Sequence, residues 1–328
     1  MIHRLMIGAV VAASLIGSPA DAQSNAPKDM PARVELYAFP TLTISHSQFL
    51  SGDDKGKEVT LTGALSIAQG TGRLPAAVLM HGSGGIGGNI QHWKRQLNAI
   101  GVSTLVIDGM TGRGFTGVGD NQAALGRLNF ILDIYRSLDI LAKHPRVDPA
   151  LIVLIGFSRG GQAALYSSVN RFQELLNKSG VGFAAYVSFY PDCATTYRND
   201  ADVTKRPIRI CHGTPDNYNP VAPCKSFVER LRRAGADVQL TEFPNAPHGF
   251  DNPLGANPTV PTRADQSVRE CRIREDENAV LISEATKVQF TYRDECVRVG
   301  PMVGADPEAA QAATVAVVDF VRSVVAAR

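Results

Sequence analysis

The sequence predicts an α/β fold, in which a mostly parallel sheet is covered by helices on both faces. Short apolar runs of the kind found in fully buried strands alternate along the chain with stretches whose apolar residues recur at helical spacing. Strands that alternate with helices form parallel βαβ units, and such a sheet needs helices on each face. A third observation is a glycine–serine turn directly after one buried run, where a strand-to-helix connection is expected.

The first 22 residues have the pattern of a secretory signal peptide. Arg4 precedes an apolar stretch at residues 5–16, and Ala20-Asp21-Ala22 matches an A-x-A cleavage site. The stretch is short for a membrane span, although an uncleaved anchor is the alternative. Cleavage leaves the net charge at +2, which is too balanced to favour nucleic acid or an anionic membrane as a partner. We therefore expect a secreted or periplasmic protein.

The remaining elements follow in order after a proline-punctuated extended segment at residues 23–45, and we expect a single domain over residues 46–328. Alternating or continuous apolar runs predict strands at residues 58–67, 76–80, 102–107, 150–155, 183–190, 207–211 and 238–243. Apolar residues at helical spacing predict helices at residues 89–100, 122–143, 221–234 and 307–325. Residues 254–304 interrupt the alternation with prolines, glycines and charges. We expect an inserted arm there, with residues 269–273 and 288–292 paired as a hairpin.

The chain has five cysteines, and export permits them to form disulfides. A Cys271–Cys296 bridge is favoured because both residues lie in an arm that looks too polar to hold itself together. A Cys193–Cys224 bridge is favoured next, because both residues follow expected strand ends. Cys211 ends an apolar strand and is expected to be a buried free thiol. The alternative is that all five thiols are reduced.

The segment Gly156-Phe157-Ser158-Arg159-Gly160-Gly161 follows the apolar run at residues 150–155. The G-x-S-x-G spacing is typical of a sharp strand-to-helix turn that exposes a serine hydroxyl, and the two glycines remove steric crowding around it. The alternative is a serine that merely caps the helix. The pattern indicates that Ser158 is a nucleophile, which requires a neighbouring base.

An acid and a base follow in the order Asp216 and His248, each in a loop after an expected strand. Such a set can act as a catalytic triad, in which the imidazole takes the serine proton and the carboxylate orients the imidazole. Asp192 and Asp251 are alternatives for the acid. His212 borders a strand-edge loop, which we expect it to shape.

The segment His81-Gly82-Ser83-Gly84-Gly85 follows the expected strand at residues 76–80. This is the position from which one oxyanion donor comes, the other being the N–H after the nucleophile. We expect the donors to be the N–H groups of Ser83 and Arg159, with Gly84 as the alternative to Ser83. His81, Gly82 and Gly84 are expected at the substrate, His81 also shaping its loop. The sequence lacks the motifs of phosphate-binding loops and of zinc sites, so no metal or cofactor is expected.

Together these motifs resemble the dienelactone hydrolase family of the α/β-hydrolase fold. The matching segments are residues 81–85, 156–161, 213–216 and 247–250. The resemblance implies an eight-stranded, mostly parallel sheet with the triad at its carboxyl edge. Residues 108–114 also resemble a pocket-lining loop of exported members, which implies that Arg113 lies near the substrate. The namesake enzyme is similar but has a cysteine where this chain has Ser158.

The sequence therefore predicts an exported serine hydrolase that cleaves a small carboxylic ester or lactone through an acyl-enzyme. A serine peptidase and an acyltransferase are alternatives, because both use the same triad on the same fold. A non-catalytic binding protein on a hydrolase scaffold is a third alternative. Such a protein is expected to lack a triad residue, whereas this sequence supplies all three.

Overall fold

The computed structural model describes residues 27–327, so the predicted signal peptide lies outside the described residues. Eight strands form one sheet in the order β1-β2-β4-β3-β5-β6-β8-β9. They are β1 (Arg33–Thr43), β2 (Lys57–Ile67), β3 (Leu74–Met80), β4 (Ser103–Asp108), β5 (Val147–Phe157), β6 (Ala185–Phe189), β8 (Ile208–Gly213) and β9 (Val238–Phe243). β1 and β2 pair antiparallel, β2 is antiparallel to β4, and the remaining pairs are parallel. The predicted mostly parallel sheet is confirmed.

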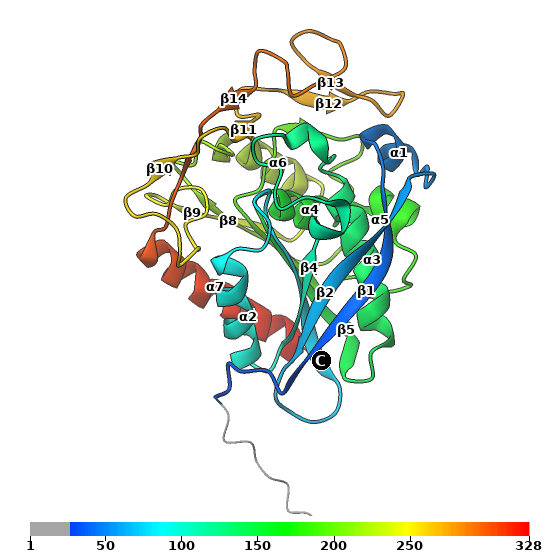
Figure 1. The fold of residues 1–328 in the computed structure, drawn as a ribbon, viewed down its shortest axis with the longest axis vertical. Coiled ribbons are helices and arrows are strands. Elements are labelled where there is room, and N and C mark those ends of the chain that lie inside the picture. Colours follow the sequence, from blue (N-terminus) through cyan, green and yellow to red (C-terminus); the bar gives the residue numbers. More distant parts are fainter. Residues whose placement is uncertain (1–26, 328) are drawn as a thin grey trace, which may run out of the picture.

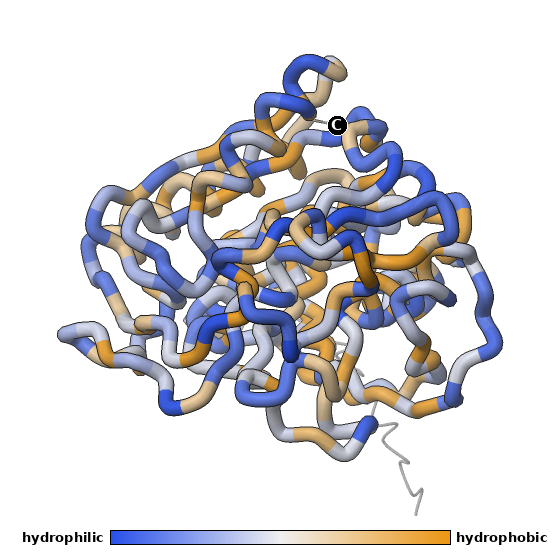
Figure 2. Tube along the Cα trace, turned by 90° about the horizontal axis from the view of Figure 1, so that it is seen from above, coloured by the Kyte–Doolittle hydropathy of each residue, from blue (hydrophilic) through white to orange (hydrophobic). Residues whose placement is uncertain are grey.

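Helices cover both faces of the sheet (Figure 1). One face carries α1 (His46–Ser51), α3 (Asn129–Lys143), α4 (Arg159–Tyr166), α5 (Asn170–Leu176) and α6 (Val221–Arg233), and the other carries α2 (Gly88–Ala99) and α7 (Pro307–Ala326). Successive side chains of β3 point to opposite faces, so Val78 joins one apolar cluster and Leu79 the other. Figure 2 shows mostly hydrophilic segments around the periphery and apolar segments toward the interior.

α7 is, among the described helices, the one that is long and apolar enough to cross a membrane by composition. In the structure it instead covers the sheet. Ala313 and Val321 are fully buried, and the helix contacts α2, β5 and β6.

The prediction that the domain starts at residue 46 is wrong, because β1 is an edge strand of the main sheet. Its partners run in register from Arg33 opposite Ile67 to Thr43 opposite Lys57. An edge strand has a neighbour on one side only, and Leu36 leaves 83% of its surface exposed. The usual pattern of buried apolar residues is therefore weak, and Pro40 further disguises the strand.

The helix predicted to start at residue 122 begins at Asn129 instead. Residues Gln122–Ala124 form a short 3-10 turn, η2. The carbonyls of Gln122 and Leu125 accept hydrogen bonds from the buried guanidinium of Arg159 rather than from helix N–H groups. A long-range side-chain contact thus replaces the first turns of the predicted helix.

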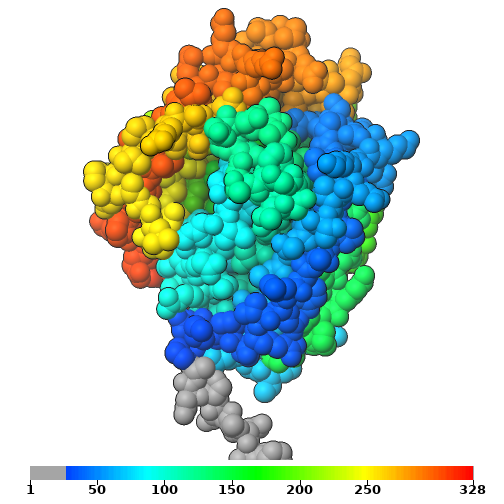
Figure 3. Space-filling model, in the orientation of Figure 1, coloured from blue at the N-terminus to red at the C-terminus, as the bar shows by residue number. Residues whose placement is uncertain are grey.

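The arm at residues 254–304 lies over the carboxyl edge of the sheet: it starts at the left of Figure 1, and its orange part forms the top of Figures 1 and 3. Its strands are β10 (Val260–Pro261), β11 (Gln266–Ser267), β12 (Ile273–Glu275), β13 (Leu281–Ser283), β14 (Arg298–Val299) and β15 (Met302–Val303). β12 pairs with β13 and with β7 (Thr195–Thr196). The predicted pairing of residues 269–273 with 288–292 is therefore wrong. Asp276 accepts the N–H groups of Asn278 and Val280, and this turn pairs β13 with β12 in place of the later segment.

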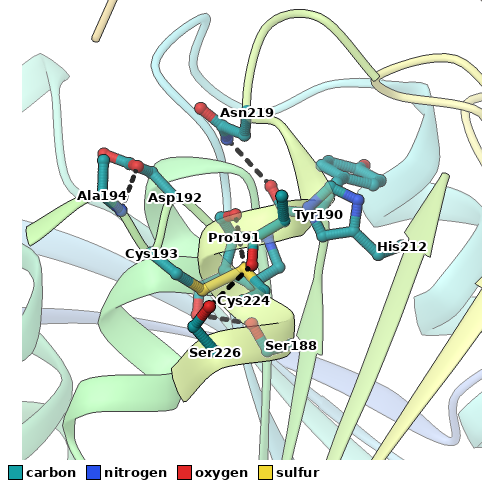
Figure 4. The surroundings of a disulfide bond; sticks show 12 residues. Ser188, Tyr190, Pro191, Asp192, Cys193, Ala194, His212, Asn219, Cys224 and Ser226 are labelled. Carbon is teal, nitrogen blue, oxygen red and sulfur yellow. Dashed lines mark hydrogen bonds between the residues drawn. A yellow bond between two sulfur atoms is a disulfide. The ribbon is translucent and has the colours of Figure 1, made fainter. Parts of the chain in front are cut away.

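The two expected disulfides are both present, and Cys211 is a buried free thiol as predicted. Cys271–Cys296 closes the arm. Cys193–Cys224 joins the segment after β6 to α6 (Figure 4). In the same view, the Asn219 amide donates to the carbonyl of Tyr190 at 2.9 Å, so this bridge lies beside the loop that follows β8.

Candidate active site

Ser158 occupies the turn between β5 and α4, as the sequence predicts. Its backbone φ is 56° and its ψ is −115°, an unfavourable conformation for a residue with a side chain. The Ser158 N–H donates to the carbonyl of Phe189 at 3.0 Å, which fixes the turn against β6. Such strain persists only where the surroundings enforce it. The conformation places the Ser158 hydroxyl beyond the carboxyl end of β5.

The two glycines of the motif are required by close backbone contacts. A Cβ atom on Gly156 would lie 1.9 Å from the carbonyl oxygen of Gly160. One on Gly160 would lie 2.2 Å from the carbonyl oxygen of Met80. Both distances are far below any real contact, so a side chain at either position would push α4 away from the strands that hold it.

The structure brings Ser158, Asp216 and His248 together, although they are far apart in sequence. His248 Nε2 lies 2.9 Å from Ser158 Oγ, and His248 Nδ1 lies 2.8 Å from Asp216 Oδ2. The carboxylate acceptor places a proton on Nδ1, which leaves Nε2 free to accept the serine proton. The second carboxylate oxygen accepts the N–H groups of Tyr218 and Asn219, at 2.8 and 2.9 Å, so Asp216 is held from both sides.

The alternative acids are engaged elsewhere. Asp192 pairs with Arg127. Asp251 accepts the Trp93 indole N–H at 2.7 Å and the Tyr190 hydroxyl at 2.6 Å, and burial raises its pKa. Neither carboxylate hydrogen-bonds to His248 in the described chain, which leaves Asp216 as the partner of the imidazole.

The glycine loop after β3 approaches the Ser158 turn closely. A Cβ on Gly82 would lie 3.2 Å from the Cβ of Ser158. Within residues 27–327, the N–H groups of Ser83 and Arg159 have no hydrogen-bond partner. The N–H of Gly84 is without a partner in the same residues, so Ser83 and Gly84 both remain candidates for the loop donor that an oxyanion needs beside Arg159.

A family model described as the dienelactone hydrolase family matches residues 61–272, which is more than half of the chain. The chain belongs to the dienelactone hydrolase family.

Solved structures agree with this assignment at the level of the fold. A dienelactone hydrolase-like promiscuous phosphotriesterase, P91, from metagenomic libraries is 17% identical with a TM-score of 0.57, covering 89% of this chain and 98% of that one. A structure named m3DLH is 18% identical with a TM-score of 0.55 and the same coverages. A search of curated proteins gave no match.

In this family member the side chain of Arg159 hydrogen-bonds to the glycine loop after β3 and holds it in place. Its guanidinium donates to Ser83 Oγ at 3.1 Å, to the Leu125 carbonyl at 2.6 Å and to the Gln122 side-chain oxygen. Burial without a carboxylate partner lowers the pKa of Arg159 to about 10. The guanidinium of Arg159 thus links the residue after Ser158 to the loop that carries Ser83.

Two tyrosines that the sequence analysis missed pack on the imidazole. Tyr218 stacks on His248 with ring centroids 4.5 Å apart, and Tyr190 meets it edge-on at 4.7 Å. The Tyr218 hydroxyl accepts from Gln122 at 3.1 Å and donates to Asp265 at 3.2 Å. The position of Tyr218, two residues after Asp216, is the one indication that sequence offered.

A cavity of about 290 Å³ opens above Ser158. The glycine loop and His248 line one part of it, and the arm lines another with Asp265, Val303 and Gly304. Gly82 and Gly84 are among the residues that line this cavity, and their contact with a substrate stays a prediction. No group of three or more His, Cys, Asp or Glu residues between positions 27 and 327 is arranged to hold a metal ion.

The expectation that Arg113 and His81 contact substrate is wrong. Arg113 is buried and donates to both oxygens of Asp133, at 2.7 and 2.8 Å, and to Thr43 Oγ1 at 2.9 Å. It ties the end of β1 to α3. His81 is buried too: its Nε2 accepts the Gly109 N–H at 3.0 Å, and burial lowers the pKa of His81. Both residues hold loops rather than line the cavity.

Proposed function

We propose that the protein is a serine hydrolase that cleaves a small carboxylic ester or lactone through an acyl-enzyme. The observation that carries the proposal is the continuous hydrogen-bonded path from Ser158 Oγ through His248 to Asp216, at 2.9 and 2.8 Å, below an open cavity. Membership of the dienelactone hydrolase family supports hydrolysis as the reaction class.

The reaction follows from the roles of these groups. His248 Nε2 takes the Ser158 proton as Oγ attacks the acyl carbon, and Asp216 orients and stabilises the resulting imidazolium. The developing oxyanion accepts the N–H groups of Ser83 and Arg159, each worth about 3 kcal/mol of transition-state stabilisation. His248 then gives its proton to the departing alcohol. Water, deprotonated by His248, attacks the acyl-enzyme, and the carboxylic acid leaves as Ser158 regains its proton.

The size of the site favours small substrates. A volume of about 290 Å³ lies at the lower end of the range for drug-sized ligands, about 300–1,000 Å³. A short acyl chain with a compact alcohol, or a lactone, fits this space better than an extended peptide. A peptidase is therefore the weaker alternative.

We also propose that the protein works in the periplasm or outside the cell. Two disulfides suit an oxidising compartment, and the N-terminal sequence has the pattern of an export signal.

The test uses the mature chain, expressed so that its disulfides form. We expect it to hydrolyse p-nitrophenyl acetate or butyrate and to react with a fluorophosphonate probe, with peptide mapping placing the label on Ser158. Ser158→Ala should lower kcat by at least about 10⁴-fold and abolish labelling, with an unchanged circular dichroism spectrum. Ser226→Ala, on the exposed side of α6, is the matched control and should keep full activity. Unchanged turnover in Ser158→Ala would rule out the proposed nucleophile.

Parallel assays with lactones, anilides and an added alcohol acceptor separate esterase, peptidase and acyltransferase activities.

A further inference from the structure

Asp265 is the one acidic residue of the arm that lines the cavity above Ser158. Its backbone is fixed on both sides: its carbonyl accepts the Gly300 N–H at 3.1 Å, and the next residue, Gln266, donates to the Gly119 carbonyl at 2.8 Å. The carboxylate lies against the Cα of Gly119, where an added Cβ would be 2.7 Å from it. Asp265 is therefore a firmly placed part of the cavity wall.

The carboxylate of Asp265 has no cationic partner. It accepts one hydrogen bond, from the Tyr218 hydroxyl at 3.2 Å, and forms no ion pair within the described chain. Among residues 27–327, no lysine or arginine lines the cavity. Partial burial, with the like charge of Asp120 nearby, raises the pKa of Asp265 and outweighs the opposite effects of the Tyr218 hydrogen bond and of His248.

The position of Asp265 relative to His248 indicates which part of a substrate it faces. The leaving group takes its proton from His248 Nε2 and therefore lies beside the imidazole. Tyr218 stacks on that imidazole, and Asp265 is bonded to the far end of Tyr218. The carboxylate thus lies in the same cavity wall as Tyr218, next to the imidazole at which a leaving group would depart.

We propose that Asp265 makes this site select esters whose leaving group carries a positive charge, and discriminate against leaving groups that carry a carboxylate. The inference rests on the proposed serine hydrolase function. A cation in the cavity gains the partner that the protein does not supply, whereas an anion is placed against an uncompensated like charge in a partly desolvated site.

Three substrates with the same butyryl group and the same two-carbon spacer test the charge preference. They are butyrylthiocholine, its uncharged isostere with a tert-butyl group in place of the trimethylammonium, and the butyryl thioester of mercaptopropionic acid. All three share the acyl group and release a thiol that one chromogenic reagent detects, so kcat/KM values compare directly. In the wild-type protein we expect the order cationic, neutral, anionic.

The variant Asp265→Asn keeps an oxygen that can accept from Tyr218 but removes the charge. The ratio of kcat/KM for the cationic to the anionic thioester should fall about tenfold or more, while kcat/KM for the neutral thioester stays within about twofold. Glu277→Gln is the matched control: it makes the same change of charge on an exposed residue of the arm and should leave all three values unchanged.

The outcomes separate the two proposals. If the neutral thioester is hydrolysed and the charge ratio does not move in Asp265→Asn, the selectivity proposal is wrong and the hydrolase proposal stands. An equal loss for all three substrates would show that Asp265 only positions Tyr218, and would also overturn selectivity. If the wild-type protein hydrolyses none of the three and resists fluorophosphonate, the hydrolase function fails, and the selectivity proposal fails with it.

Discussion

The carboxyl edge of the sheet and the arm at residues 254–304 both border the cavity above Ser158, but different interactions hold them in place. Ser158 follows β5, whose residues from Ile152 to Ile155 are completely buried. The arm has strands of two or three residues, a disulfide and side-chain contacts to the loops below. Gln266 accepts the Gln122 N–H at 2.9 Å, and Ser267 donates to the Tyr218 carbonyl at 2.6 Å.

The difference separates two tasks. Nucleophile, base and acid need positions fixed to a fraction of an ångström, and a close-packed apolar framework provides them. The wall that meets the substrate is attached by polar contacts and a cross-link, which tolerate sequence change without disturbing the core. The proposed chemistry thus depends on the sheet, and the proposed substrate preference depends on the arm.

The largest effect on activity is expected from a change at the carboxyl edge of the sheet, in the loop after β8. Asp216→Asn should lower kcat by about 10⁴-fold, because the amide favours the wrong tautomer of His248. The midpoint of thermal unfolding should change little, since the amide oxygen still accepts the N–H groups of Tyr218 and Asn219. Asp237→Asn, at an exposed pair with Arg209, is the control and should behave as wild type. A loss smaller than tenfold in Asp216→Asn would contradict the assignment of the acid.

A second change tests whether Arg113 serves the framework or the substrate. Arg113→Met leaves the buried Asp133 unpaired and should reduce the free energy of unfolding by about 3–5 kcal/mol, with KM unchanged. Chemical denaturation and steady-state kinetics measure both quantities. The double variant Arg113→Met/Asp133→Leu should recover most of the lost stability. A raised KM in a stable double variant would instead return Arg113 to the substrate site.

The smallest effect on global stability is expected in the arm. Cys271→Ser/Cys296→Ser removes about 3 kcal/mol of loop-closure stabilisation, but only from the arm. Limited proteolysis should cut residues 254–304 first, and kcat/KM should fall several-fold while the main thermal transition stays. The matched change Cys193→Ser/Cys224→Ser should lower that transition, because this bridge joins the buried segment after β6 to α6. Equal thermal shifts in both double variants would remove the distinction between arm and framework.

The same distinction explains what the sequence could predict. The turn at Ser158 obeys a local steric rule, and the buried strands around it are apolar along their length, so both were recognisable. The partner of Arg113 is Asp133, on a helix that no local pattern links to it. The approach of Asp265 to Tyr218 depends on the path of the whole arm. The sequence analysis did not predict β1 as a strand of the main sheet, because an edge strand buries few of its side chains. Features set by tertiary contacts were thus those that the sequence analysis missed or misassigned.

The unpaired Cys211 has a consequence for how the chain keeps its covalent connectivity. Burial, together with the charge of the nearby Asp251, raises the pKa of Cys211 to about 12. Thiol–disulfide exchange begins with attack by a thiolate, and at neutral pH this sulfur is almost entirely protonated and shielded from reagents. In the folded protein Cys211 is therefore a poor nucleophile for exchange with either disulfide. A thiol that could attack the chain's two disulfides is thus kept inert by the packing around β8, the strand that precedes Asp216.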